Sequence, residues 1–67
     1  MRVRYGMRPG ELIRALKSNG IRTSELIAEL DAPESTVRRW LAQKNPLSTV
    51  VTYAAQAAIQ EIVRRRV

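Results

Sequence analysis

The stretch that decides the fold reads IRTSELIAELDAPESTVRRWL and covers residues 21–41. It holds two short apolar patterns, each with the three- and four-residue spacing of one face of a helix. The first predicts a helix over about 24–30 with Thr23 as its N-cap, and the second predicts a helix over about 34–43. Residues 31–33 between them allow only a tight turn, and their proline suits the first turn of a new helix.

Five apolar residues are spaced so that they meet where these two helices cross. Two short helices joined by a tight turn cross steeply and share a small contact, so few side chains can be buried between them. The outer side of the second helix is then left to face outward. The five residues are Leu26, Leu30, Ala32, Val37 and Trp40.

A further helix is predicted on each side of this pair. The first runs over 9–18, because its proline suits the first helical turn. Its apolar residues on one side are Leu12, Ile13 and Leu16. Gly20 follows and can take the left-handed conformation that ends many helices. The last helix runs from about 47 or 48 to 65, since its alanine-rich stretch is strongly helical and no pairing strand lies nearby.

Length and composition define the class of protein. The 67 residues allow one compact domain over 1–67, and we expect an all-α fold of four to five helices. The chain has no cysteine and no histidine, so it lacks a disulfide framework, a thiolate metal site and the usual general base. We therefore expect no enzyme activity, no metal and no cofactor. No apolar run is long enough to span a bilayer, and we expect a cytoplasmic protein.

The charge is strongly positive and unevenly distributed. The chain holds 12 Lys and Arg against 6 Asp and Glu, a net charge of +6. Residues 1–22 hold six basic groups and one acid, 23–33 hold three acids and no base, and 34–67 hold six basic groups and two acids. This pattern indicates a protein with one positive face, as nucleic-acid-binding proteins have. A surface kept soluble by its charge is the alternative.

The segment from Ile21 to Leu41 resembles the helix-turn-helix of Cro- and phage-repressor-like regulators. It departs from that family at Asp31, where glycine is usual, and at Ile27, where a small residue is usual. The resemblance implies a lambda-repressor-like fold with the motif at about 23–43. In size, in the position of the motif and in the helix after a proline-containing loop, the chain is also similar to anti-CRISPR-associated regulators.

On the second helix of the motif, Val37, Trp40 and Leu41 should face inward. The resemblance implies that its outward residues near the start contact base edges in the major groove of double-stranded DNA. Arg38 and Arg39 are the best candidates for a bidentate hydrogen bond to guanine. The alternative is that both arginines contact phosphate, which gives affinity without sequence preference. The expected base-contacting residues are Arg38, Arg39, Ser35 and Glu34. Glu34 could accept a hydrogen bond from cytosine N4, but a carboxylate in the first turn also favours the helix dipole. Ser35 can equally be a helix-start residue.

Hydroxyl groups and free N–H groups at the start of the first motif helix form a common arrangement for gripping phosphate, and capping alone is the alternative. Basic and polar residues next to both motif helices can contact the DNA backbone in the same way. The expected phosphate-binding residues are Thr23, Ser24, Arg22, Thr36, Gln43, Lys44 and Asn45.

The last helix carries more apolar surface than one contact needs, in two stripes. One stripe is Val50, Tyr53, Ala54 and Ala57; the other is Val51, Ala55, Ala58, Ile59 and Ile62. Thr52, Gln56 and Gln60, spaced by four, mark the polar edge. We expect the first stripe to cover the core and the second stripe to form a homodimer. The alternative is a monomer whose last helix wraps around its own core. A two-fold dimer would place two recognition helices about 34 Å apart.

The expected function is that of a dimeric repressor that binds an inverted repeat in a promoter of phage or mobile-element type. Two alternatives stay open: a DNA-packaging or recombination accessory protein with the same motif, and an antitoxin-like protein-interaction module. No small-molecule ligand is expected. A membrane partner is not expected either, because the basic residues are spread over several elements rather than one helical face. Arg64–Arg66 suit the last helical turn and could reach phosphate, and Arg2 and Arg4 could form a minor-groove arm.

Overall fold

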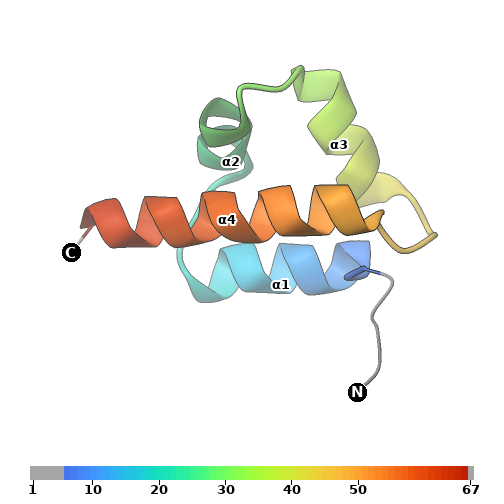
Figure 1. The fold of residues 1–67 in the computed structure, drawn as a ribbon, viewed down its shortest axis with the longest axis horizontal. Helices are drawn as coiled ribbons and strands as arrows, with labels where there is room; N and C mark the ends of the chain where they lie inside the picture. Colours follow the sequence, from blue (N-terminus) through green and yellow to red (C-terminus); the bar gives the residue numbers. More distant parts are fainter. Residues whose placement is uncertain (1–5, 67) are drawn as a thin grey trace.

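The computed structural model describes residues 6–66, which form four α-helices and no strand. The helices are α1 (Pro9–Ser18), α2 (Thr23–Leu30), α3 (Glu34–Ala42) and α4 (Thr49–Arg66) (Figure 1). The predicted all-α class is confirmed for this part of the chain. Arg2 and Arg4 lie outside the described residues.

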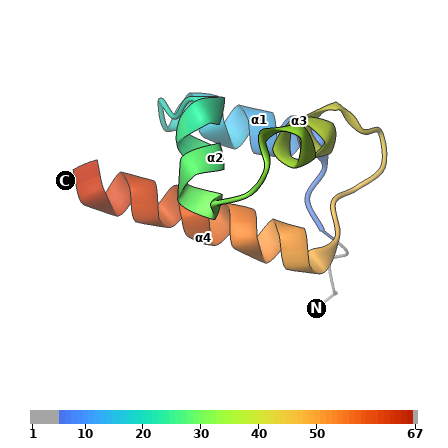
Figure 2. The same cartoon turned by 90° about the horizontal axis from the view of Figure 1, so that it is seen from above.

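The four helices form two layers. α1 and α4 run in the same direction along the long axis of the molecule, and α2 and α3 lie above them, steeply inclined to each other (Figures 1 and 2). α2 packs on α4 and α3 packs on α1. The side chains between the layers form one core, which consists of Leu12, Leu16, Ile21, Leu26, Val37, Leu47, Ala55, Ala58, Ile59 and Ile62.

The turn between α1 and α2 follows from Gly20. Its φ of 64° is left-handed, as predicted, and brings two backbone N–H groups onto the last carbonyls of α1. The N–H of Gly20 donates to the carbonyl of Lys17 at 3.1 Å, and the N–H of Ile21 donates to that of Leu16 at 2.8 Å. Ile21 is thereby turned into the core, where it is 6% exposed. This cap therefore both ends α1 and sets the start of α2.

The start of α2 differs from the prediction. Its N-cap is Arg22, and Thr23 is already the first helical residue. The N–H of Arg22 donates to Oε1 of Glu25 at 2.8 Å, so a carboxylate in the first turn caps the helix instead of the Thr23 hydroxyl. α2 ends at Asp31, whose φ of 55° is left-handed. Aspartate tolerates this conformation better than most residues do, so Asp31 can end α2 there.

Two predictions about which side chains face the core are wrong. Ile13 of α1 is 36% exposed, whereas Leu12 and Leu16 are buried. Thr52, predicted on the polar edge of α4, is 7% exposed. Its Oγ1 accepts the N–H of Met7 at 3.0 Å, and the carbonyl of Met7 accepts the N–H of Leu47 at 2.9 Å. Thr52 is buried because it anchors the segment before α1 to the start of α4.

The prediction of which stripe of α4 covers the core is wrong. The residues expected to form the dimer mostly belong to the monomer core: Ala55, Ala58, Ile59 and Ile62 are 0–9% exposed. Val51 is half-buried against the same core. They are covered because this side of α4 lies against α2 and the other core helices, so it is unavailable to a second copy.

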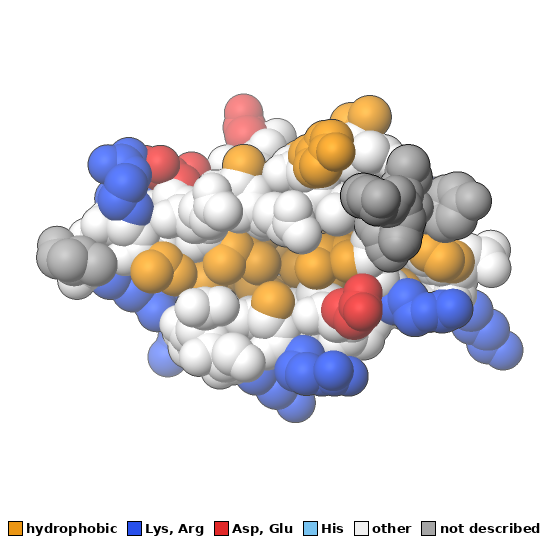
Figure 3. Space-filling model, turned by 60° about the horizontal axis from the view of Figure 1, so that its bottom comes forward, with side chains coloured by type: hydrophobic (Ala, Val, Ile, Leu, Met, Phe, Trp, Pro, Cys, Tyr) orange, Lys and Arg blue, Asp and Glu red, His pale blue; other side chains and the backbone are white. Residues whose placement is uncertain are grey.

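The outer stripe of α4 consists of Val50, Tyr53, Ala54 and Ala57, and it faces away from the core. Val50 is 76% exposed and Tyr53 is 67% exposed, the largest exposed fractions among the large hydrophobic side chains of residues 6–66. Ala57 is exposed and Ala54 is half-buried. Figure 3 shows hydrophobic side chains on the outer side of the first half of α4 and in a band along the seam between α4 and α1.

Candidate nucleic-acid interface

One side of α3 packs against the core, and its opposite side faces outward. Val37 is fully buried, and Trp40 and Leu41 pack against the core, as predicted. The opposite side carries Ser35 and the two adjacent arginines, all of which are exposed. Since the helix is anchored through its inner side, the outer side chains stand on a rigid support.

The two arginines of α3 have different surroundings. Nε of Arg38 donates to Oε2 of Glu34 at 2.6 Å, one helical turn earlier. Both side chains of this pair are more than 60% exposed. Arg39 is also exposed, and it forms no ion pair with any residue in the described range. A carboxylate therefore orients Arg38, whereas Arg39 has no such partner among residues 6–66.

The segment after α3 is braced by Gln43. Its Nε2 donates to the carbonyl of Asn45 at 2.9 Å and lies 3.4 Å from that of Pro46. Gln43 is half-buried, whereas Lys44 and Asn45 are exposed. The amide of Gln43, expected to bind phosphate, is thus engaged with the loop, and it holds Lys44 and Asn45 at the end of the helix. Thr36, also in the expected set, is half-buried.

The start of α2 presents polar groups as well. Arg22 and Ser24 are exposed and Thr23 is half-buried. The backbone N–H groups of Thr23 and Ser24 have no acceptor among residues 6–66, because they belong to the first turn. In Figure 2 the start of α2 lies on the α1 side of the molecule, as does α3. The structure therefore brings most of the predicted contact residues to two neighbouring elements.

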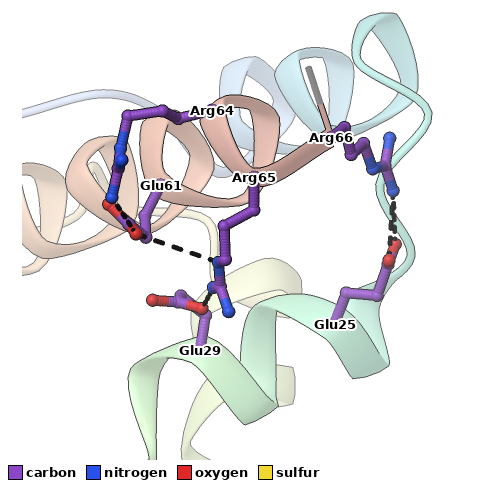
Figure 4. Close-up of polar contacts among 6 residues, drawn as sticks. All are labelled: Glu25, Glu29, Glu61, Arg64, Arg65 and Arg66. Atoms are coloured by element: carbon purple, nitrogen blue, oxygen red, sulfur yellow. Dashed lines mark hydrogen bonds and ion pairs between the residues drawn. The ribbon is translucent and has the colours of Figure 1, made fainter.

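The arginines at the end of α4 are engaged within the chain (Figure 4). Arg64 pairs with Glu61, and Arg65 pairs with Glu29 of α2. Nη2 of Arg66 lies 3.0 Å from both carboxylate oxygens of Glu25. We call these three arginines with their three glutamates, listed as Glu25, Glu29, Glu61, Arg64, Arg65 and Arg66, the C-terminal clasp.

The C-terminal clasp also reaches the turn between α1 and α2. Arg66 donates to the carbonyls of Asn19 and Gly20 at 2.8 and 3.0 Å. The N–H of Arg22 and the guanidinium of Arg66 hold the pKa of Glu25 below its ordinary value. Sequence reasoning missed this contact, although the block of acids in residues 23–33 is a signal that a basic segment could pair with it.

The ion pairs of the C-terminal clasp leave unpaired basic side chains only in other parts of residues 6–66. In the described part of the chain, the basic side chains without an ion pair belong to α1, its flanking residue and the segments around α2 and α3. They are Arg8, Arg14, Lys17, Arg22, Arg39 and Lys44. Three of the six, at positions 22, 39 and 44, belong to the predicted contact set. The candidate interface thus keeps its positive charge while the end of α4 is neutralised.

Among residues 6–66, no three His, Cys, Asp or Glu side chains are grouped so that they could hold a metal ion. In the same range, no helix is both long enough and apolar enough to cross a bilayer. Comparison with models of protein families, with curated proteins and with solved structures finds no match for this chain.

Proposed function

We propose that the protein is a sequence-specific regulator that binds double-stranded DNA through α2 and α3 as a helix-turn-helix. The observation that supports this most is the division of α3, with Val37 fully buried and the side chains of Ser35, Arg38 and Arg39 exposed on one surface. A helix anchored on one side and basic on the other fits the major groove, where arginine can bind guanine edges.

Phosphate contacts would fix the position of α3 in the groove. The start of α2 offers the N–H groups and hydroxyls of Thr23 and Ser24 beside Arg22. Lys44 and Asn45 offer a charge and an amide at the other end of α3. Contacts of this kind determine register and affinity, whereas base contacts determine sequence preference. The C-terminal clasp lies outside this set.

The proposed regulator is a homodimer that forms through the outer stripe of α4. Residues 45–60 contain no charged side chain, in a chain that is 27% charged. Val50 and Tyr53 supply exposed apolar area, and Ala54 and Ala57 let a second helix approach closely. Tyrosine enrichment and a lack of charge mark the centres of protein interfaces. A second copy matches this stripe because a two-fold axis pairs it with itself.

Such a dimer would act as a repressor by occupying an inverted repeat in a promoter of phage or mobile-element type, in the cytoplasm. Selection from a random pool of DNA, followed by footprinting, tests this directly. The expected result is an inverted repeat with half-sites about one DNA turn, roughly 34 Å, apart. Binding without any sequence preference would refute the proposal and would favour a packaging or recombination accessory protein. Co-purification of an unrelated protein on α4 would favour an antitoxin-like module.

Two substitutions separate the proposed interface from general charge. Arg39→Ala should weaken DNA binding and make its salt dependence shallower by about one counterion, if Arg39 contacts phosphate. Arg64→Ala removes the same charge from the C-terminal clasp and should leave binding to the selected site unchanged. Equal weakening by both substitutions would show that only the net charge of the protein matters.

The dimer is tested by sedimentation at several protein concentrations. Tyr53→Glu introduces a charge at the centre of the outer stripe and should shift the protein toward monomer. Gln56→Glu introduces the same charge about a sixth of a helical turn away from Tyr53, at the polar edge of α4, and should change the association less. An unchanged dimer in Tyr53→Glu, or a wild-type protein that stays monomeric with and without DNA, would contradict the proposed interface.

A further inference from the structure

The ion pair between Glu34 and Arg38 lies on the surface proposed to face DNA. Nε of Arg38 is 2.6 Å from Oε2 of Glu34, with both side chains more than 60% exposed. Exposed pairs one helical turn apart contribute little to stability. A carboxylate close to a DNA-binding surface also repels phosphate. Stabilisation of the fold therefore does not explain why this pair lies on the surface proposed to bind DNA.

The ion pair with Glu34 involves only Nε of Arg38 and not its two η nitrogens. The guanidinium is planar and carries five N–H donors, one on Nε and four on the two η nitrogens. Glu34 engages Nε, and the η nitrogens of Arg38 have no acceptor among residues 6–66. Those two nitrogens form the fork that donates to O6 and N7 of guanine in the major groove. Because the group is rigid, holding Nε also limits where the fork can point.

We propose that Glu34 is a positioning residue that holds the fork of Arg38 toward a guanine, so that each half-site carries a guanine opposite Arg38. This inference rests on the proposed function, since it takes α3 to be the helix that enters the groove. It assigns different tasks to the two arginines of α3. Arg38, with a carboxylate partner, recognises a base, and Arg39, without an ion pair, contacts phosphate.

Two effects of opposite sign are expected when Glu34 loses its charge. Glu34→Gln keeps the length of the side chain and removes the charge. Its affinity for unrelated DNA should rise, because a negative charge near the phosphates is gone. Its preference for guanine over the other bases at the position opposite Arg38 should fall about tenfold, within the range that one bidentate arginine–guanine contact provides.

The experiment uses the full chain and the site recovered by selection. Arg38→Ala first identifies the position, as the one base pair at which preference is lost. Binding of the wild type and of Glu34→Gln is then measured on the four sequences that differ at that base pair, at one salt concentration. Glu61→Gln is the matched control, because it removes a carboxylate partner from Arg64 in the C-terminal clasp. The control should change neither the preference nor the affinity for unrelated DNA.

A readout on the free protein tests the positioning itself. In nuclear magnetic resonance spectra, the Nε–H of Arg38 should exchange with water more slowly in the wild type than in Glu34→Gln. A role limited to the helix dipole would leave this rate unchanged. Circular dichroism of each variant verifies that it is folded before its DNA binding is compared.

The outcomes that overturn the inference differ from those that overturn the proposed function. If the wild type selects a sequence and Glu34→Gln keeps its full preference for guanine, the positioning role is refuted and DNA recognition stands. Loss of preference at a neighbouring cytosine instead would show that Glu34 contacts a base directly. A wild type without sequence preference would refute both.

Discussion

Replacing Gly6 with alanine tests how the segment before α1 is attached. Gly6 has a φ of 155°, and an added Cβ would lie 1.9 Å from the carbonyl oxygen of Leu47 and 2.8 Å from Oγ1 of Thr52. Neither neighbour can give way easily, since Leu47 is 2% exposed and Thr52 is 7% exposed. The segment must therefore shift away from α4.

The shift breaks the bond from the N–H of Leu47 to the carbonyl of Met7 and the bond from the N–H of Met7 to Oγ1 of Thr52, at about 0.5–1.5 kcal/mol each. Gly6→Ala should thus lose about 1–3 kcal/mol, which is large against the roughly 3–10 kcal/mol typical of a 67-residue chain.

The measurement is unfolding in guanidinium chloride at fixed protein concentration, followed by the fluorescence of Trp40 and by circular dichroism. Gly10→Ala is the matched control, because an added Cβ at Gly10 meets nothing within 4 Å. It should raise stability, by at most about 1 kcal/mol, since alanine is the better helix former. An unfolding midpoint of Gly6→Ala equal to or above that of the wild type, with unchanged hydrogen exchange of the Met7 amide, would refute the attachment of Met7 to Leu47 and Thr52.

Three further changes can be measured in the same way. Leu26→Ala should lose about 2–5 kcal/mol, because the fully buried side chain leaves a cavity between α2 and the core; retention of a wild-type midpoint would contradict the packing. Gly20→Ala should lose about 1–2 kcal/mol, because its left-handed conformation strains alanine, and an unchanged melting temperature would argue against that cap. The pKa of Glu25 is lowered, by the N–H of Arg22 and then by Arg66. Its stabilisation is therefore present above the ordinary value of 4.5 and is lost as the pH falls below it, so the difference in melting temperature between wild type and Arg66→Gln should become smaller on going from pH 7 to pH 3.

The pair of short helices was predictable because its signals are local. Apolar spacing identified Val37, Trp40 and Leu41 as the inner side of α3, and the short turn before Glu34 left little choice of connection. Gly20 and Asp31 take the left-handed conformations that their chemistry favours. The N-cap of α2 was misplaced by one residue, because a hydroxyl and a nearby glutamate can both cap a helix start.

The sequence by itself thus determined the all-helical class, the order of the helices and the side of α3 that points outward. Only the tertiary structure decided which stripe of α4 is covered, since both stripes are apolar and the helical period cannot rank them. It also decided the fate of the C-terminal arginines, because Arg66 meets Glu25 across 41 positions of sequence. Local sequence patterns identify the apolar faces of a helix, whereas the face that becomes buried depends on the other helices that pack against it.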